Sequence, residues 1–452
     1  LTSHKTRIAT TQRSKLLFMI LLKITQDFTF KIKRVIQLVS EQEQRMRNRF
    51  EEMAQEVLET NTDSNDLVAG IEAEYSIIDN NLISASETQR DDIINQTNHT
   101  GKELGAHQFE INTPPLELSN FENILQSLNS IEQKAKKVAS KSGLHLIRIG
   151  MDPFVPIGQI PRSFQESKYK LVPDFHDYFR DPNFDTKLGR IDVGDAAVVG
   201  ISNSVQFNLQ ASSLQDAVDK MNRSFMIAPY VIALSNNSRF IDGIDSKIGD
   251  TRMFAWELSH DLRTPIQRMY DKETKVGMIN TYFRDIQDYF DRIQKGYFIL
   301  DVPEAALQVG IGLYWKDTRI KFIDNTPIVE FRPISIQPTA EEDVALFSFW
   351  LGRLLYSQQI NEPLQDLPTV SINRVNAMQF GTKTKFDNGW ASKVIPYEIE
   401  KAKIGLDNVG IHPFGFDILY NKLQTGTPAY IMAESMNEIS ELPEKIWECR
   451  VK

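Results

Sequence analysis

The chain has 452 residues and a formal net charge of −9, which argues against a nucleic-acid backbone as its main partner. Its hydrophobic and charged fractions, 41% and 25%, are ordinary for a globular protein, so we expect a packed core rather than a disordered chain. A single cysteine, Cys449, excludes an intrachain disulfide framework and a multi-cysteine zinc site. We therefore expect a cytoplasmic protein, a monomer or homodimer, without a membrane or nucleic-acid partner.

The first 66 residues are predicted to form a helical N-terminal extension. The chain begins with Leu rather than Met, so we interpret part of this extension as non-native. Its apolar run, residues 16–22, is far too short to span a bilayer. From Asp27 to Thr60 the mixed charges are typical of a helix with a solvated face that packs on the main domain. Residues 67–452 are predicted to form that domain, with helices from about residue 340.

The first clear strand pattern is Ile71-Glu72-Ala73-Glu74-Tyr75. Side chains alternate between the two faces of a strand, so Glu72 and Glu74 share one face while Ala73 and Tyr75 face a core. Two adjacent carboxylates repel each other unless a positive charge lies between them. The face is therefore either an ordinary solvated one or a site for a hard cation such as Mg²⁺.

Three later segments repeat this alternation of apolar and polar side chains. They are residues 106–115, with Gln108, Glu110 and Asn112 on the polar face; 205–210, with Gln206, Asn208 and Gln210; and 329–333, with Glu330 and Arg332. A further strand is predicted over 144–149 and a loop over 87–101. Helices are predicted over 121–142, 214–234, 284–294 and 341–355, with their apolar faces toward the sheet.

Residues 151–190 are rich in proline, basic and aromatic residues, including Arg162, Lys168 and Tyr169. A long basic segment in an acidic protein indicates either a lid that binds anions or an ordinary surface excursion. No P-loop motif is present, and Gly310-Ile311-Gly312 alone does not make a dinucleotide fingerprint. The seven histidines show no metal-ligand spacing, so we interpret His107 and His145 as structural.

If the four strands are neighbours, their polar faces line one cavity. That face would carry Glu72, Glu74, Glu110 and Glu330, and four confined carboxylates need cations to remain ionised. Two or more Mg²⁺ ions would neutralise them and bridge the phosphates of a nucleotide. Arg332 and Arg252 could then grip a phosphate or carboxylate as bidentate forks. These are the components of phosphoryl transfer without a protein nucleophile. The alternative is that the strands lie in different sheets and the acids are solvated.

The order of these motifs resembles the glutamate–cysteine ligase family. The resemblance rests on residues 70–74, 109–114, 205–209 and 329–332, and on Asn237-Ser238, Arg252, Trp256, Asp261 and Arg263-Thr264. The Gln206-x-Asn208 strand is similar to the plant and proteobacterial branch. The resemblance covers roughly residues 68–335, with a weaker helical match beyond.

This resemblance implies an α+β, glutamine-synthetase-like fold: a curved, mostly antiparallel sheet that forms an open funnel, with helices outside. It also implies a catalytic ligase domain over 67–452 that uses ATP and Mg²⁺ to join glutamate to cysteine through γ-glutamyl phosphate. The implied catalytic residues are Arg252 and Arg332. The implied metal ligands are Glu72, Glu74, Glu110, Gln206 and Glu330. The implied ATP contacts are Asn208, Glu330, Arg332 and Lys168, and the implied substrate contacts are Arg252, Asn237, Ser238 and Tyr169.

Three residues depart from the family pattern: Arg239, where Pro is usual; Asp250, where Ser is common; and Pro265, where Gly is usual. They lie near the expected entrance of the substrate site rather than near the metal ligands. The identity of the amine acceptor is therefore left open by the sequence. A ligase that joins glutamate to another amine is one alternative. A non-catalytic relative that binds nucleotide or amino acid is another, although the intact set of acids argues against it.

Overall fold

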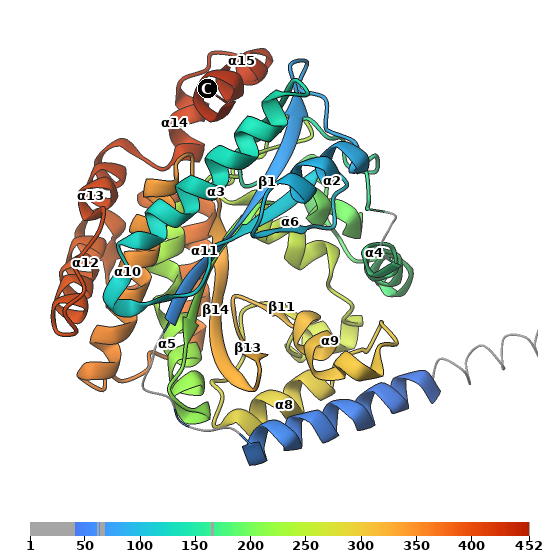
Figure 1. Cartoon of the computed structure of the whole chain (residues 1–452), viewed down its shortest axis with the longest axis vertical. Coiled ribbons are helices and arrows are strands. Elements are labelled where there is room, and N and C mark those ends of the chain that lie inside the picture. The colour runs from blue at the N-terminus through green and yellow to red at the C-terminus, as the bar shows by residue number, and fades with distance from the viewer. Residues whose placement is uncertain (1–40, 61–62, 64–67, 164–166, 452) are drawn as a thin grey trace, which may run out of the picture.

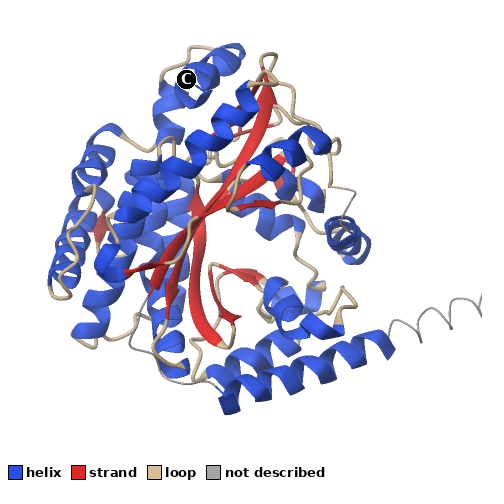
Figure 2. Ribbon diagram, viewed as in Figure 1, coloured by secondary structure: helices blue, strands red, loops and turns tan. Residues whose placement is uncertain are grey.

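A computed structural model describes residues 41–60, 63, 68–163 and 167–451. Its centre is an eight-stranded sheet in which the main strands run in the order β13-β14-β8-β1-β3-β2, with β4 and β5 also pairing with β1. All pairings in this sheet are antiparallel. Figures 1 and 2 show the sheet as a strongly curved ribbon, with helices gathered on one side and a more open space on the other.

The strands of this sheet alternate as their sequences predict. Their bounds are β1 (Val68–Asp79), β2 (Thr100–Lys102), β3 (Gln108–Asn112), β4 (Leu116–Glu117), β5 (Leu144–Ile147), β8 (Ser204–Gln210), β13 (Thr318–Ile323) and β14 (Thr326–Ser335). Ile71, Ala73, Phe109, Phe207 and Phe331 are all buried on the helical side. Since side chains alternate along a strand, the polar neighbours of these residues must face the open side.

Helices cover the apolar side of the sheet (Figure 1). They include α3 (Asn123–Ser140), α5 (Leu214–Ser235) and α10 (Ala340–Gln359). Phe347 of α10 stacks on Phe207 of β8 with ring centroids 4.6 Å apart, and Trp350 stacks on Phe331 of β14 at 5.3 Å. Burial of large aromatic surface is a major source of stability, so these contacts fix α10 against the centre of the sheet.

The remaining described elements surround this core. The helices are α2 (Glu87–Gln96), α4 (Ser167–Phe179), α6 (Thr251–Ser259), α7 (Pro265–Met269), α8 (Ile286–Gln294), α9 (Ala306–Gly312), α11 (Leu367–Phe380), α12 (Ala391–Asp407), α13 (Phe416–Thr425), α14 (Pro428–Glu434) and α15 (Leu442–Ile446). Short strand pairs are β6 (Lys187–Leu188) with β7 (Ile191–Asp192), β9 (Phe240–Ile241) with β10 (Ile244–Asp245), β11 (Val276–Gly277) with β12 (Trp315–Lys316), and β15 (Lys385–Phe386) with β16 (Gly389–Trp390).

The structure confirms the strands and helices predicted above and corrects two segments. The predicted loop over 87–101 contains α2, which begins with a capping box between Ser86 and Gln89. The helix was hidden because Arg90, a polar residue, is its most deeply buried side chain and donates to Gly105 O at 3.3 Å. The irregular segment over 151–190 contains the thirteen-residue helix α4.

The N-terminal extension is described only from residue 41. Residues 41–60 form one helix, whose apolar side chains are buried, whereas residues 1–40 lie outside the described residues. Throughout the described part of the chain, no helix has the length and apolar character needed to cross a membrane. The boundary at residue 66 remains a prediction.

Candidate functional site

The register of β1 brings three of the predicted polar faces together. Glu72 pairs with Asn112 of β3 on one side and with Gln206 of β8 on the other. Glu74 pairs with Glu110 of β3. Directly paired residues have their Cβ atoms only about 5 Å apart. Two segments far from β1 in sequence therefore place their polar side chains beside its two carboxylates.

The fourth polar face joins the same surface through β14. Glu330 pairs with Asn208 of β8 and with Arg319 of β13. Asn208 Nδ2 donates to Glu72 Oε1 at 3.2 Å, so it lies between Glu72 and Glu330. The structure therefore places four carboxylates on one surface, as the sequence predicts: Glu72, Glu74, Glu110 and Glu330.

This surface is one wall of a cavity of about 480 Å³. The opposite walls come from α4, α9 and the end of α6. The lining includes Glu72, Glu74, Glu103, Glu110, Lys168, Tyr169, Gln206, Trp256, His260, Gln308, Gly312, Trp315, Arg319, Lys321, Glu330 and Arg332. A cavity of this size suits a ligand as large as a nucleotide.

One half of the polar wall is balanced by basic side chains. Glu330 receives hydrogen bonds from Arg319, from Lys321 Nζ at 2.9 Å and from Arg332 Nη1 at 2.5 Å. Burial alone would raise the pKa of Glu330, but these three cations outweigh it and hold the pKa well below its usual value. Lys321 Nζ also lies 2.5 Å from Glu72 Oε1. Glu330 is therefore ionised, and both carboxylates are paired with protein cations.

The other half of the wall is short of positive charge. Burial raises the pKa of Glu110 to about 7, and the neighbouring Glu72 carboxylate adds to the effect. Burial also raises the pKa of Glu103 well above its usual value, helped by Glu110 and Glu74. Gly101 of β2 makes room for this crowding, because a Cβ there would lie 2.6 Å from Glu110 Oε1. Crowded carboxylates of this kind are a setting in which a bound cation lowers the free energy.

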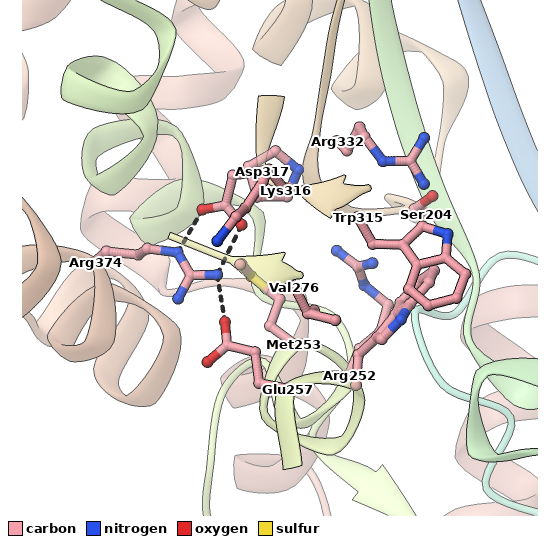
Figure 3. Close-up of a pocket in the computed structure, with 13 residues that line it drawn as sticks. Ser204, Arg252, Met253, Glu257, Val276, Trp315, Lys316, Asp317, Arg332 and Arg374 are labelled. Carbon is pink, nitrogen blue, oxygen red and sulfur yellow. Dashed lines mark hydrogen bonds and ion pairs between the residues drawn. The ribbon is translucent and has the colours of Figure 1, made fainter. Parts of the chain in front are cut away.

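A smaller cavity of about 40 Å³ adjoins the first and shares Trp256, Trp315 and Arg332 with it. Figure 3 shows Arg252 and Arg332 among its lining residues, with Arg374 joined to Asp317 and Glu257 on the far side. Arg252 Nε donates to Ser335 Oγ at 3.3 Å, but its buried Nη2 has no hydrogen-bond partner. A buried guanidinium nitrogen without a partner is costly, so it indicates an anionic ligand at this point.

Two of the predicted substrate contacts lie behind the site rather than in it. Asn237 and Ser238 are buried and line neither cavity. Asn237 Nδ2 donates to Ile336 O at 2.7 Å, and Ser238 Oγ donates to Asp250 Oδ1 at 2.8 Å. The same Ser238 oxygen accepts from the backbone N–H of Arg252 at 3.2 Å. Ser238 therefore positions the start of α6, and Asn237 is tied to the backbone after β14. Their burial outside both cavities corrects their predicted direct contact with substrate.

The predicted lid residues reach the large cavity. Lys168 and Tyr169 of α4 both line it, and the Lys168 ammonium lies 4.6 Å from the centre of the Tyr169 ring. Tyr169 Oη donates to Lys102 O at 2.7 Å, which attaches α4 to β2. Arg162, the other basic residue singled out, pairs with Asp174 Oδ1 at 2.6 Å and does not line the cavity.

Sequence reasoning missed Arg319 and Lys321, which lie on β13. A signal was present: Thr318, Ile320 and Phe322 alternate with these two residues, and Asp324-Asn325 follows. Both turn residues have positive φ, 47° and 61°, as a tight hairpin between β13 and β14 requires. Glu103 carried no recognisable pattern, because it reaches the cavity just after the end of β2. His260 follows Arg252 and Trp256 at the same four-residue spacing, and this was the signal that could have found it.

The predicted metal ligands fit a hard cation chemically but do not form a closed shell. Among the described residues, no three His, Cys, Asp or Glu side chains converge as a ready-made metal-ligand set. Lys321 lies between Glu72 and Glu330, while Ser204 N and Gln206 Nε2 donate to Glu74. The carboxylates Glu103 and Glu110 supply the oxygen donors that Mg²⁺ prefers. Lys168 and Arg332 act on Glu103, and Lys321 acts on Glu110, without outweighing the effect of burial.

Sequence comparisons match most of this chain to one family. A family model described as glutamate-cysteine ligase family 2 matches residues 68–389. The chain is 22% identical over 355 residues to the chloroplastic glutamate–cysteine ligase A of Oryza sativa subsp. indica, covering 72% of this chain and 69% of that protein. It is 24% identical over 353 residues to the chloroplastic glutamate–cysteine ligase of Arabidopsis thaliana, covering 73% and 64%.

Solved structures share the fold. A glutamate–cysteine ligase from Francisella tularensis in complex with AMP has a TM-score of 0.53 and 14% identity, covering 85% of this chain and 88% of that one. A bifunctional glutathione synthetase from Pasteurella multocida has a TM-score of 0.54 and 11% identity, covering 85% and 51%. At such identities the likeness concerns the fold alone. It confirms the expected α+β architecture with a curved antiparallel sheet.

Proposed function

This chain belongs to the glutamate–cysteine ligase family 2, and on that basis we propose that it joins the γ-carboxylate of L-glutamate to the amine of L-cysteine, using ATP and Mg²⁺. The observation that carries the proposal is the single wall formed by Glu72, Glu74, Glu110 and Glu330. Strands β1, β3 and β14 present these carboxylates to one cavity, with β8 paired between β1 and β14. Arg332, which lines both cavities, lies where this wall meets the smaller cavity.

The two cavities are proposed to bind different ligands. In the large cavity Glu72, Glu74, Glu110, Gln206 and Glu330 would hold Mg²⁺, which supplies neutralisation of phosphate charge when bound. Glu330, Arg332 and Lys168 line this cavity and are proposed to contact ATP there. Asn208, which does not line the cavity but donates to Glu72 beside it, is also proposed to contact ATP.

In the smaller cavity, the unpartnered Nη2 of Arg252 would hold the glutamate carboxylate or its phosphoryl group. Arg332 would stabilise the charge that develops as the γ-phosphoryl group moves to that carboxylate. The amine then displaces phosphate from γ-glutamyl phosphate and forms the amide bond. Tyr169 of α4 is proposed to help close the site over the substrates.

ADP release with ATP, Mg²⁺, glutamate and a panel of amines tests this proposal. Turnover that requires cysteine supports it, whereas turnover only with another amine assigns a different acceptor. If no amine supported turnover, the proposal would be wrong and the chain would be a non-catalytic relative that binds nucleotide or amino acid.

In the same assay Glu74→Gln should lower kcat at least about 100-fold without unfolding the protein, because it removes one of the carboxylates proposed to hold Mg²⁺. The matched control is Glu117→Gln, the same change on exposed Glu117 of β4, which should retain wild-type turnover. Near-normal activity of Glu74→Gln would contradict the role given to the wall.

A further inference from the structure

One face of α6 carries three polar atoms that have no hydrogen-bond partner in the described part of the chain. Arg252, Trp256 and His260 follow one another at intervals of four residues, so they lie on one side of the helix and its C-terminal cap. Arg252 Nη2, Trp256 Nε1 and His260 Nε2 are all buried without a hydrogen-bond partner. Buried polar atoms normally have a hydrogen-bond partner. These three lie on one helix face whose residues line the two cavities, so they indicate a surface shaped for a polar ligand.

His260 holds its ring in a fixed orientation beside the large cavity. Its side chain is 3% exposed, and Nδ1 lies 2.7 Å from Ser259 Oγ. Its ring contacts those of His176 at 4.4 Å and Trp315 at 5.2 Å between centroids. Burial, together with the nearby His176, holds the pKa of His260 well below its usual value, so the ring is neutral at pH 7. It therefore presents one uncharged nitrogen within an aromatic wall.

We propose that His260 is a specificity-determining residue for the amine acceptor, and that its Nε2 pairs with the small polar group on the side chain of an amino acid, a thiol or a hydroxyl. This inference rests on the proposed ligase function. Consecutive positions on this face are about 6 Å apart along the helix axis, so Trp256 Nε1–H can meet the carboxylate of the same amino acid. Arg252, one turn further along the helix, would then bind the glutamyl group.

The physical basis is the cost of an unpaired polar atom. Nε2 is already buried in the structure. A thiol or hydroxyl of the acceptor would satisfy it, whereas an acceptor without a polar side chain would leave it unpaired. Sites built to hydrogen-bond a substrate group reject analogues that lack the group. His260 should therefore favour L-cysteine or L-serine over L-2-aminobutyrate, which has the shape of cysteine without the polar group.

The experiment compares kcat and KM for L-cysteine, L-serine and L-2-aminobutyrate in wild type, His260→Phe, His260→Gln and His260→Asn. Wild type should prefer one polar acceptor by at least about tenfold in kcat/KM. The ratio to follow is kcat/KM for the preferred polar acceptor divided by kcat/KM for L-2-aminobutyrate. His260→Phe should bring this ratio near one by changing the KM for the acceptor. The KM values for ATP and glutamate should stay at their wild-type values. Gln can place a polar atom near the position of Nε2, but Asn cannot reach it, so Gln should keep most of the preference and Asn should lose it.

The control is His145→Phe, since His145 lies on β5 and bonds to Asn80 Oδ1 at 2.9 Å rather than lining a cavity. This variant should keep the wild-type ratio. An unchanged ratio in His260→Phe or His260→Asn would overturn the inference while leaving the ligase function standing. Absence of amine-dependent turnover in wild type would instead overturn the proposed function itself. If His260→Phe does not fold, as judged by its thermal unfolding midpoint, the Gln and Asn pair decides the outcome.

Discussion

At the scale of single residues, Lys321 changes the electrostatics expected from the sequence. Four clustered carboxylates were expected to need metal ions to remain ionised. In the structure Lys321 Nζ lies 2.5 Å from Glu72 and 2.9 Å from Glu330, and Arg319 and Arg332 also contact Glu330. Protein cations therefore balance this half of the wall, whereas burial and crowding leave the pKa values of Glu103 and Glu110 raised.

The residue-scale prediction concerns Lys321→Met. Removing this ammonium leaves Glu72 without its cation and Glu330 with one fewer, so divalent cations should bind the nucleotide-free protein several-fold more tightly. Turnover should fall, because one positive charge that lines the large cavity is lost. Titration with Mn²⁺ and ADP release measure the two effects. Lys393→Met, on the exposed face of α12, is the control and should alter neither. Unchanged cation affinity would show that Lys321 does not compete with metal.

At the scale of elements, α4 is held to the rest of the site by histidine. His176 of α4 packs against His260 at 4.4 Å and against Trp315 of β12 at 5.5 Å between ring centroids. Its Nδ1 bonds to Val172 O at 2.8 Å. Burial lowers the pKa of His176 to about 4, with further contributions from Lys275 and Arg180. The contact therefore requires neutral rings.

This contact predicts a loss of stability in mild acid. The unfolded chain binds a proton at His176 near pH 6.5, whereas the folded chain does so near pH 4. Neutral His176 therefore contributes fully to the free energy of unfolding above pH 6.5. This contribution is lost as the pH falls toward 4, and the loss amounts to up to about 3 kcal/mol for this group. Urea unfolding between pH 7.5 and 5 should show a shallower pH dependence for His176→Phe than for wild type. His412→Phe, an exposed site, should match wild type. If the free energy of unfolding changed equally with pH in wild type, His176→Phe and His412→Phe, the proposed linkage to His176 would be refuted.

At the scale of the whole molecule, the N-terminal helix braces the wall of the large cavity. Met46, Phe50, Ala54 and Val57 recur every three or four residues along 41–60 and are buried in the same core as the sheet. Phe50 contacts the rings of Phe290 and Phe298, with centroids 6.0 and 5.6 Å apart. A Cβ on Gly310 of α9 would lie 2.8 Å from the Phe50 ring, so the helix packs directly on α9. That helix lines the cavity through Gln308 and Gly312.

Phe50→Ala should therefore affect both stability and nucleotide binding. Truncation of a fully buried Phe costs about 3–5 kcal/mol, measured as the free energy of unfolding in urea. Because α9 loses its support, the KM for ATP should rise more than the KM for glutamate. Glu51→Ala, at the exposed neighbouring position, should change neither quantity appreciably. A destabilised variant with unaltered KM for ATP would confine the helix to a purely structural role.

The sequence determined which residues face the site within each strand. A strand has a period of two, so Phe109 and Ile111 in the core require Glu110 on the opposite face, whatever the strand's neighbours are. The same local rule placed Glu72, Glu74, Gln206, Asn208, Glu330 and Arg332, and the helical spacing placed α3, α5 and α10. Family membership followed from the order of these motifs along the chain.

Only the tertiary structure decided which strands and helices meet. The pairing of β13 with β14 set Arg319 opposite Glu330, and the packing of α6 brought Arg252 and His260 to the cavities. It also buried Asn237 and Ser238 behind them. Periodicity is a property of neighbouring residues in one segment, whereas these contacts join segments up to some 250 residues apart, such as Lys321 with Glu72. Such pairings depend on the packing of the whole core, which no local pattern specifies.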